Sequence, residues 1–314
     1  MISNENAPLG FNVVILAVLF GVDEKIFGIR FRGGYTIERL SLVPSISHLD
    51  EVFSVEAIEL RRLFETAVID DRLNVACACK KMYFEFHKKS DEDLSEKVNK
   101  IINEELICLD NQIRAVRLLT ESPIRFKDFV FEANAKNNFT YKSKVPIREG
   151  NISLSELSSW DNIRIDYINS NLDRIVFPFK NQLLNQCHIL YDLSYHQLTP
   201  ASSLLLLVIC LEILFLDNES SGKEPLAKRC SIFISSNQQE AIEIHKNIIT
   251  LYRKRSKFVH EGIIDKITKQ DILLLREYVR RSLLKWLEDG YTKSELIKSL
   301  KERVSSSQYF INKA

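Results

Sequence analysis

The 314-residue sequence lacks an excess of charge of either sign. Charged residues make up 27% of the chain and nearly cancel, leaving a formal net charge of +1. No global field therefore draws the whole protein to nucleic acid or to an anionic membrane, and any site for a polyanion has to be local. The 45% content of hydrophobic residues is enough to bury at least one full core, and the length favours two domains.

The sequence also lacks the cysteine spacing of a disulfide framework or of a zinc site. Cysteines at such scattered positions are typical of small buried hydrophobic residues in a reducing compartment. No second pair of cysteines or histidines completes a ligand set beside Cys77 and Cys79, so the sequence predicts no metal and no cofactor. The cysteines occupy positions 77, 79, 108, 187, 210 and 230.

An export signal and a membrane span are missing as well. The N-terminus has no positive charge before its apolar run at 11–22, and that run lacks a small-residue cleavage pattern. The other apolar run, residues 203–216, is shorter than the roughly 18 apolar residues that a span needs, and it contains Glu212. These features predict a cytoplasmic protein with no membrane partner, in which residues 203–216 form a buried core helix.

Short β-branched and aromatic runs, punctuated by glycine, dominate the first half of the sequence. Gly33 and Gly34 fit a hairpin turn. Residues 54–69 and a longer stretch from about 90 to 119 carry apolar residues at helical spacing. Strands mixed with helices predict an α+β N-terminal domain at residues 1–152, a candidate sensor or partner-binding domain. The predicted strands are 12–22, 25–33, 35–42, 73–86, 125–133 and 138–147.

Strand patterns almost disappear after residue 152, and helical patterns follow one another instead. Pro200, Pro225 and Gly262 lie at expected helix ends, because proline suits a first turn and glycine the position after a last turn. The sequence thus predicts an all-α domain at residues 153–314, an antiparallel helical bundle with its core at about 165–290. The predicted helices are 154–172, 177–195, 200–217, 224–236, 238–260 and 268–289.

The most informative stretch is LYRKRSKFVHEG, residues 251–262, at the predicted end of the helix at 238–260. Ser256 lies four residues and Arg253 seven residues before His260, so these three side chains share one helix face. Arg255 lies off this face, although its long side chain can swing round if the last turn loosens. Histidine titrates near neutral pH and arginine can grip two phosphate oxygens at once, so the stretch suits a phosphodiester.

The segment RSKFVH resembles the ribonuclease motif of the HEPN superfamily, an arginine and a polar residue followed by a histidine after four to six intervening residues. Arg255, Ser256 and His260 match the four-residue spacing, and Arg253 gives the six-residue spacing. The segments LLLLVICLEILFL and EPLAKRCSIFIS resemble the ApeA-like branch of that superfamily, and the likeness covers roughly residues 165–290. Ser256 stands where the wider superfamily often has Asn, Asp or His.

This resemblance implies an HEPN-like helical bundle and an endoribonuclease that needs no metal, since RNA carries its own nucleophile in the 2′-hydroxyl. Arg255 and His260 would carry the reaction, assisted by Arg253 and Ser256, and cleavage would leave a 2′,3′-cyclic phosphate. Two such motifs meet across a dimer in HEPN nucleases, so we expect a homodimer that acts on single-stranded RNA or tRNA. ApeA-like proteins point to prokaryotic antiviral or toxin-like defence.

Three further residues are candidates for supporting roles, namely Glu212, Tyr252 and Lys257. Glu212 needs a partner, because an unpaired carboxylate in a core is strongly destabilising. Either it forms a structural ion pair with Arg229 or another base, or it orients one of the motif arginines from the neighbouring helix. Basic residues also outnumber acidic ones ten to four between positions 253 and 285, which suits a polyanion partner.

The sequence leaves two other functions open. One is a non-catalytic HEPN dimerisation module, in which the N-terminal domain binds a ligand or a protein partner that activates or inhibits the helical half. The other is a nucleotide-binding component, although the sequence has no Gly-rich phosphate loop and no paired metal-binding carboxylates. Exposure of His260 and both arginines in a cleft favours the nuclease, whereas their burial favours the interaction module.

Overall fold

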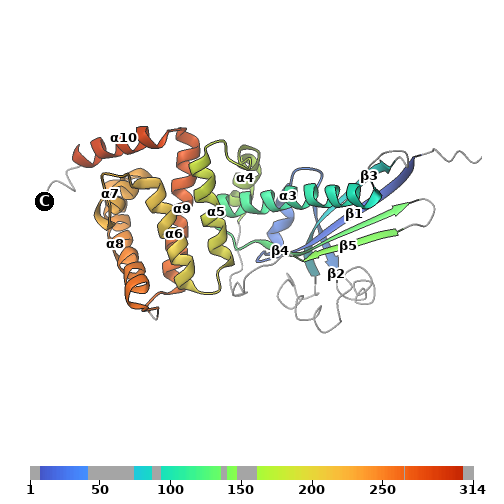
Figure 1. Cartoon of the computed structure of the whole chain (residues 1–314), viewed down its shortest axis with the longest axis horizontal. Coiled ribbons are helices and arrows are strands. Elements are labelled where there is room, and N and C mark those ends of the chain that lie inside the picture. Colours follow the sequence, from blue (N-terminus) through green and yellow to red (C-terminus); the bar gives the residue numbers. More distant parts are fainter. Residues whose placement is uncertain are drawn as a thin grey trace, which may run out of the picture. The chain divides into compact units, whose positions relative to one another are not determined.

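The computed structural model of the chain describes residues 8–41, 74–86, 93–135, 140–146, 161–264 and 266–306. The described residues divide into two compact units; the first ends at Val176 and the second begins at Phe177 (Figure 1). The first unit combines an antiparallel sheet with helices and the second is all-helical, which confirms the predicted fold class. The predicted domain boundary at residue 152 and the predicted helix at 54–69 lie outside the described residues.

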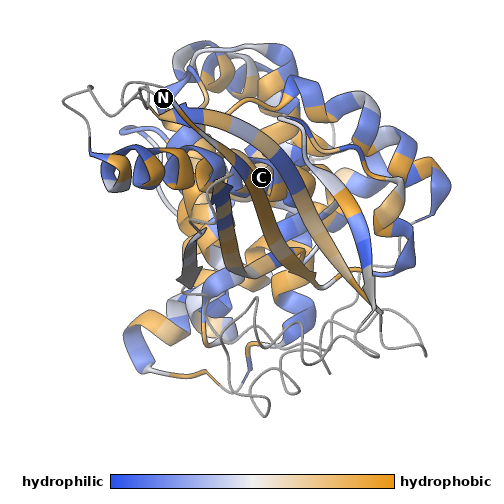
Figure 2. Cartoon of the chain, turned by 90° about the vertical axis from the view of Figure 1, so that its right-hand side faces the viewer, coloured by the Kyte–Doolittle hydropathy of each residue, from blue (hydrophilic) through white to orange (hydrophobic). Residues whose placement is uncertain are grey.

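The strands of the first unit form one antiparallel sheet in the order β2-β3-β1-β4-β5. The central strand β1 pairs with β3 on one side and with β4 on the other. Its alternating residues Val13, Ile15 and Ala17 are at most 1% exposed, so this face of the strand is core. In Figure 2 the strands carry both hydrophobic and hydrophilic positions, as expected of a sheet with unequally buried faces. The strand bounds are β1 Leu9–Phe20, β2 Thr36–Ser41, β3 Asn74–Phe86, β4 Arg125–Ala135 and β5 Thr140–Pro146.

Helix α3 (Leu94–Thr120) is tied to the sheet by polar contacts. Its Glu105 pairs with Lys80 of β3, with 2.5 Å between Oε1 and Nζ. Tyr35 donates its hydroxyl hydrogen to the Glu105 carbonyl oxygen at 3.3 Å, and its ring centroid lies 5.4 Å from Lys80 Nζ. Burial and the nearby Glu105 carboxylate raise the pKa of Tyr35 well above its usual value. We call Lys80, Glu105 and Tyr35 the first-unit cluster.

The predicted strand at 25–33 is wrong, because this segment forms a short helix and a loop. Residues Glu24–Gly28 form the 3-10 helix η1, which the carboxylate of Asp23 caps by accepting the N–H of Lys25 at 2.9 Å. A local bond from a side chain to the backbone competes with strand pairing, and the β-branched pattern of the segment gives no sign of it.

The loop after η1 is fixed by helix α4 (Asn162–Asn171), which follows it by more than a hundred residues in the sequence. The side chain of Asn169 accepts the N–H of Arg30 and donates to the Gly28 carbonyl oxygen, both at 2.9 Å. The segment therefore satisfies its backbone groups through a distant amide rather than through a neighbouring strand. This contact also explains why α4 packs with the first unit.

The second unit contains helices α5 to α10 within the described residues, and α6 lies at its centre, in contact with α5, α7, α8 and α9. Leu204, Leu207 and Leu211 of α6 are fully buried, which confirms the predicted core helix. None of the helices in the described ranges is long and apolar enough to cross a membrane. The bounds are α5 Gln182–Leu193, α6 Pro200–Phe215, α7 Lys223–Ile234, α8 Gln238–Glu261, α9 Lys269–Asp289 and α10 Lys293–Ser306.

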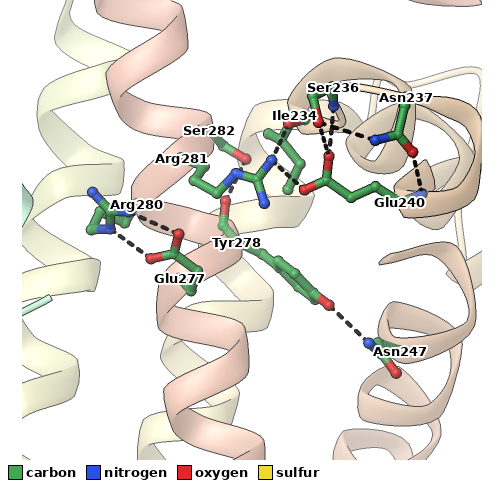
Figure 3. Close-up of polar contacts among 10 residues, drawn as sticks. All are labelled: Ile234, Ser236, Asn237, Glu240, Asn247, Glu277, Tyr278, Arg280, Arg281 and Ser282. Carbon is green, nitrogen blue, oxygen red and sulfur yellow. Dashed lines mark hydrogen bonds and ion pairs between the residues drawn. The ribbon is translucent and has the colours of Figure 1, made fainter. Parts of the chain in front are cut away.

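Both ends of α8 are fixed by specific contacts. At its first turn, Glu240 accepts the backbone N–H and the hydroxyl of Ser236 at 2.7 and 2.6 Å, and it pairs with Arg281 of α9 at 2.7 Å (Figure 3). The bonds from Ser236 and the Arg281 charge lower the pKa of Glu240 to about 2. At its other end, Gly262 adopts a φ of 69° and donates its N–H to the Phe258 carbonyl oxygen at 3.1 Å. A left-handed glycine of this kind ends many helices.

Candidate functional site

The candidate residues of α8 lie on two different sides of the helix. Arg253 and His260 are exposed, and Ser256 is half-buried. A helix turns by about 100° per residue, so Arg253 and His260 differ by only about 20° around the axis, whereas Arg255 and His260 differ by about 140°. The structure thus groups Arg253, Ser256 and His260, as the spacing predicts, and it places Arg255 on another side.

Arg255 turns toward α6, where it meets the glutamate of the core helix. Its Nη2 lies 3.7 Å from Oε2 of Glu212, and both side chains are about one-fifth exposed, 20% and 23%. Tyr252 lies one turn before Arg255 on α8, and its ring centroid is 5.6 Å from the Arg255 guanidinium carbon. Burial, together with the hydrogen bond from Tyr252 to the Glu212 carboxylate, raises the pKa of Tyr252. We call Glu212, Tyr252 and Arg255 the second-unit cluster.

The geometry decides between the two partners considered for Glu212. Arg229 donates to the Phe215 carbonyl oxygen at 2.7 Å and lies 3.6 Å from the carboxylate of Asp217. It is therefore occupied by the segment just after α6, and the cation beside Glu212 is Arg255. The contact is not saturated, because Nε of Arg255 is buried and has no hydrogen-bond partner among the described residues.

The basic residues that the sequence counts between positions 253 and 285 are mostly committed to the fold. Nζ of Lys254 donates to both carboxylate oxygens of Asp271 of α9, at 2.7 and 2.8 Å. Arg276 is buried and donates to the Ser194 carbonyl oxygen at 2.7 Å, with its guanidinium carbon 4.0 Å from the centroid of the Tyr195 ring. Basic residues with such partners are not free to bind a polyanion. The others with partners are Arg255, Lys269, Arg280, Arg281 and Lys285.

Asp271 is a contact residue that the sequence analysis did not predict, although its spacing from Thr268 is typical of a helix cap. Thr268 and Asp271 form a capping box at the start of α9, in which each side chain accepts the backbone N–H of the other residue. The spacing Thr-x-x-Asp before an apolar helical run predicts such a box. The sequence gives no sign that Lys254, on another helix, adds an ion pair to it. This pair holds the last turns of α8 to the first turn of α9.

His260, Arg253 and Lys257 stand apart from these contacts. Their side chains are exposed and make no hydrogen bond or ion pair with another described residue. Arg253 and Lys257 share the side of His260, and Glu261 lies about 100° further round the axis, so one chain supplies one histidine here. Reactions that need both an acid and a base then require a second copy or the RNA itself.

Among the described residues, no group of three or more His, Cys, Asp or Glu side chains is placed to hold a metal ion. No protein-family model, no curated protein and no solved structure matches the chain, so known proteins give no template for the site. The likeness to the HEPN superfamily therefore stays a prediction that rests on the residues and motifs of this sequence.

Proposed function

We propose that the protein is a metal-independent endoribonuclease of the HEPN type, acting on single-stranded RNA or tRNA in the cytoplasm. The observation that supports it most directly is the exposure of Arg253 and His260 on one side of α8, directly before the chain turns at Gly262. A cation and an imidazole with no other partner are what a phosphodiester needs at neutral pH. A role in prokaryotic antiviral or toxin-like defence follows from the resemblance.

The chemistry is an internal transfer at phosphorus. The 2′-hydroxyl loses its proton to a base and its oxygen attacks the adjacent phosphorus, while the bond to the 5′-oxygen breaks and that oxygen takes up a proton. The products are a 2′,3′-cyclic phosphate and a 5′-hydroxyl. His260 supplies one of the two proton transfers, and arginine stabilises the negative charge that grows on the phosphate oxygens.

The second proton transfer calls for a second copy of the chain. One chain offers one histidine at this position, and a two-fold homodimer brings two motifs together across its axis. The composite site then has one His260 as base and the other as acid. Light scattering of the active protein checks this arrangement, since a monomer that still cleaves RNA at working concentration contradicts it.

The test of the function is cleavage of labelled single-stranded RNA by purified protein. We expect cleavage by the wild type in the presence of EDTA and products ending in 2′,3′-cyclic phosphate. His260→Ala should lower the rate by at least about a hundredfold, the scale of losing a general acid or base. Val259→Ala is the matched control, because Val259 is its 47% exposed neighbour. Equal rates for wild type and His260→Ala, or activity that disappears with EDTA, contradict the proposal.

A non-catalytic interaction module is the second candidate, and one observation favours it. Arg255, the arginine at the four-residue spacing, is already engaged by Glu212 rather than open to RNA. In this version the helical unit serves for dimerisation and the first unit binds an activating or inhibiting protein partner. A wild-type protein that binds RNA or a partner but cuts no RNA under any of these conditions supports it.

A further inference from the structure

Seven exposed residues of α8 follow one line along the helix. Successive steps along the line alternate between four and three residues, which is the spacing that keeps side chains on one face. Ser256 and Arg255 lie beside the line and are half-buried. The seven positions are Gln239, Glu243, Lys246, Thr250, Arg253, Lys257 and His260; the other exposed residues of α8 are Gln238, Val259 and Glu261.

The stretch of this line from Lys246 to His260 carries no carboxylate. It offers three permanent cations, Lys246, Arg253 and Lys257, followed by the imidazole of His260. Glu243 precedes it, and Glu261 follows it at the last turn. With a rise of 1.5 Å per residue, it is about 20 Å long. We call the line from Lys246 to His260 the α8 stripe.

The cations of the stripe differ from the basic residues next to them on α8 in having no partner. The side chains of Lys246, Arg253 and Lys257 make no ion pair or hydrogen bond with another residue in the described ranges. Their neighbours Lys254 and Arg255, by contrast, are paired with Asp271 and Glu212. Free cations in a row are available to phosphates, and paired cations are not unless they first give up a carboxylate.

We propose that the α8 stripe is the track along which one RNA strand lies, and that Arg253, not Arg255, is the arginine that contacts the phosphate beside His260. The proposal rests on the proposed function. Arg255 then serves the fold, by holding α8 to α6 through Glu212. This assignment reverses the order of the two arginines that the four-residue motif spacing predicts.

The width and chemistry of the stripe fit a single strand. A row one residue wide can follow one sugar–phosphate backbone, whereas proteins that bind double-stranded RNA contact successive grooves over a broad surface. Apart from the His260 imidazole, the stripe has no aromatic side chain on which a base could stack. Its binding is therefore electrostatic, tolerant of sequence and steeply dependent on salt.

Binding is measured apart from cleavage in a His260→Ala background, by fluorescence anisotropy of labelled oligouridine at several salt concentrations. Three contacts to a single strand predict a slope of log K against log salt of about −2, since each contributes about −0.7. We expect Lys246→Glu, Arg253→Glu and Lys257→Glu each to weaken binding about tenfold and to flatten this slope. Lys298→Glu is the matched control, because Lys298 is an exposed lysine of α10.

Three outcomes of this experiment overturn the track. One is equal affinity for Lys298→Glu and the three stripe variants. Another is competition by an RNA duplex of the same length as strong as that of the single strand. The third is equal competition by an acidic polypeptide such as polyglutamate, which would make the stripe a site for an acidic protein. Weaker competition by both supports the proposal.

The assignment of the arginines is read from a second pair of variants in the same background. Arg253→Ala should lower affinity and flatten the salt slope while leaving the thermal midpoint near that of the parent. Arg255→Ala should lower the midpoint by a few degrees and leave the salt slope unchanged. A lower midpoint for Arg253→Ala together with a flatter salt slope for Arg255→Ala contradicts the assignment. The same measurements separate the two proposals. If the wild type binds RNA along the stripe but never cleaves it, only the proposed nuclease activity is contradicted. If the wild type cleaves RNA while the stripe variants bind it normally, only the proposed RNA track is contradicted.

Discussion

Each of the two units contains a cluster of a cation and a tyrosine around one glutamate, but the two clusters differ in ion-pair distance and in exposure to solvent. In the first-unit cluster, Lys80 and Glu105 are 2.5 Å apart and are 15% and 13% exposed. In the second-unit cluster, Arg255 and Glu212 are 3.7 Å apart and more exposed. The same three kinds of side chain thus make a closed structural contact in one unit and a looser contact beside a candidate site in the other.

The difference lies in what surrounds the cation. Lys80 projects from β3, which has a strand on each side, toward Glu105 of α3, and Tyr35 beside it is only 3% exposed. Arg255 projects from the last turns of a helix whose next face is open to solvent. An ion pair exposed to water contributes little to stability, whereas removing one partner of a buried ion pair leaves an uncompensated buried charge and is strongly destabilising. The two clusters should therefore respond differently to the same substitution.

The largest effect is expected from Glu105→Gln in the first-unit cluster. This change leaves the Lys80 ammonium half-buried without its carboxylate, and it should lower the free energy of unfolding by about 3 kcal/mol. Chemical denaturation followed by circular dichroism measures it. Glu104→Gln, one residue earlier and exposed, is the control and should change stability by less than about 0.5 kcal/mol. Equal effects of the two variants would remove the distinction between a closed and an open cluster.

A smaller effect is expected from Glu212→Gln in the second-unit cluster. Arg255 keeps access to water and the amide still accepts the Tyr252 hydroxyl, so the loss should be about 1 kcal/mol. The exposed residue Glu302 of α10 supplies the control, as Glu302→Gln, in the same denaturation experiment. A loss as large as that of Glu105→Gln contradicts the view that this cluster is the looser one.

The smallest effect is a difference in alkaline sensitivity. Both tyrosines have a raised pKa, and that of Tyr35 is raised further, first by burial and then by Glu105. A raised pKa means that the folded state holds the proton more tightly, so its stabilisation is complete below the unfolded value of about 10 and is lost as pH rises above it. Tyr35→Phe should therefore flatten the fall in stability above about pH 10 more than Tyr252→Phe does. Thermal unfolding across this range measures the two slopes.

Helix positions could be predicted well where local signals agree. The predictions 200–217 and 238–260 match α6 and α8 within two residues, because helical spacing, Pro200 at the start of α6 and Gly262 after α8 point the same way. The shared face of Arg253, Ser256 and His260 follows from spacing alone. Local pattern failed at 25–33, where Asn169 fixes the backbone from far along the chain.

The partners of the charged residues could not be predicted. That Arg255 meets Glu212 and Lys254 meets Asp271 depends on which helices are neighbours and how each is rotated, and neither is encoded in a window of sequence. The ten-to-four excess of basic residues therefore says little about which cations are open to a phosphate. Within that excess, a period of three and four residues does reveal that Arg253 and Lys257 share the side of His260.

The left-handed turn at Gly262 places a requirement of chirality directly after the candidate site. Apart from its two neighbours in the chain, no atom of the described residues lies within 4 Å of the place where a Cβ at this position would be, so there is room for a side chain. The obstacle is handedness, because the φ of 69° is unfavourable for an L-residue and favourable for its mirror image. A semisynthetic chain with D-alanine at position 262 should keep the helix end that L-alanine disturbs, and the arrangement of His260 would then be shown to depend on backbone stereochemistry rather than on the small size of glycine.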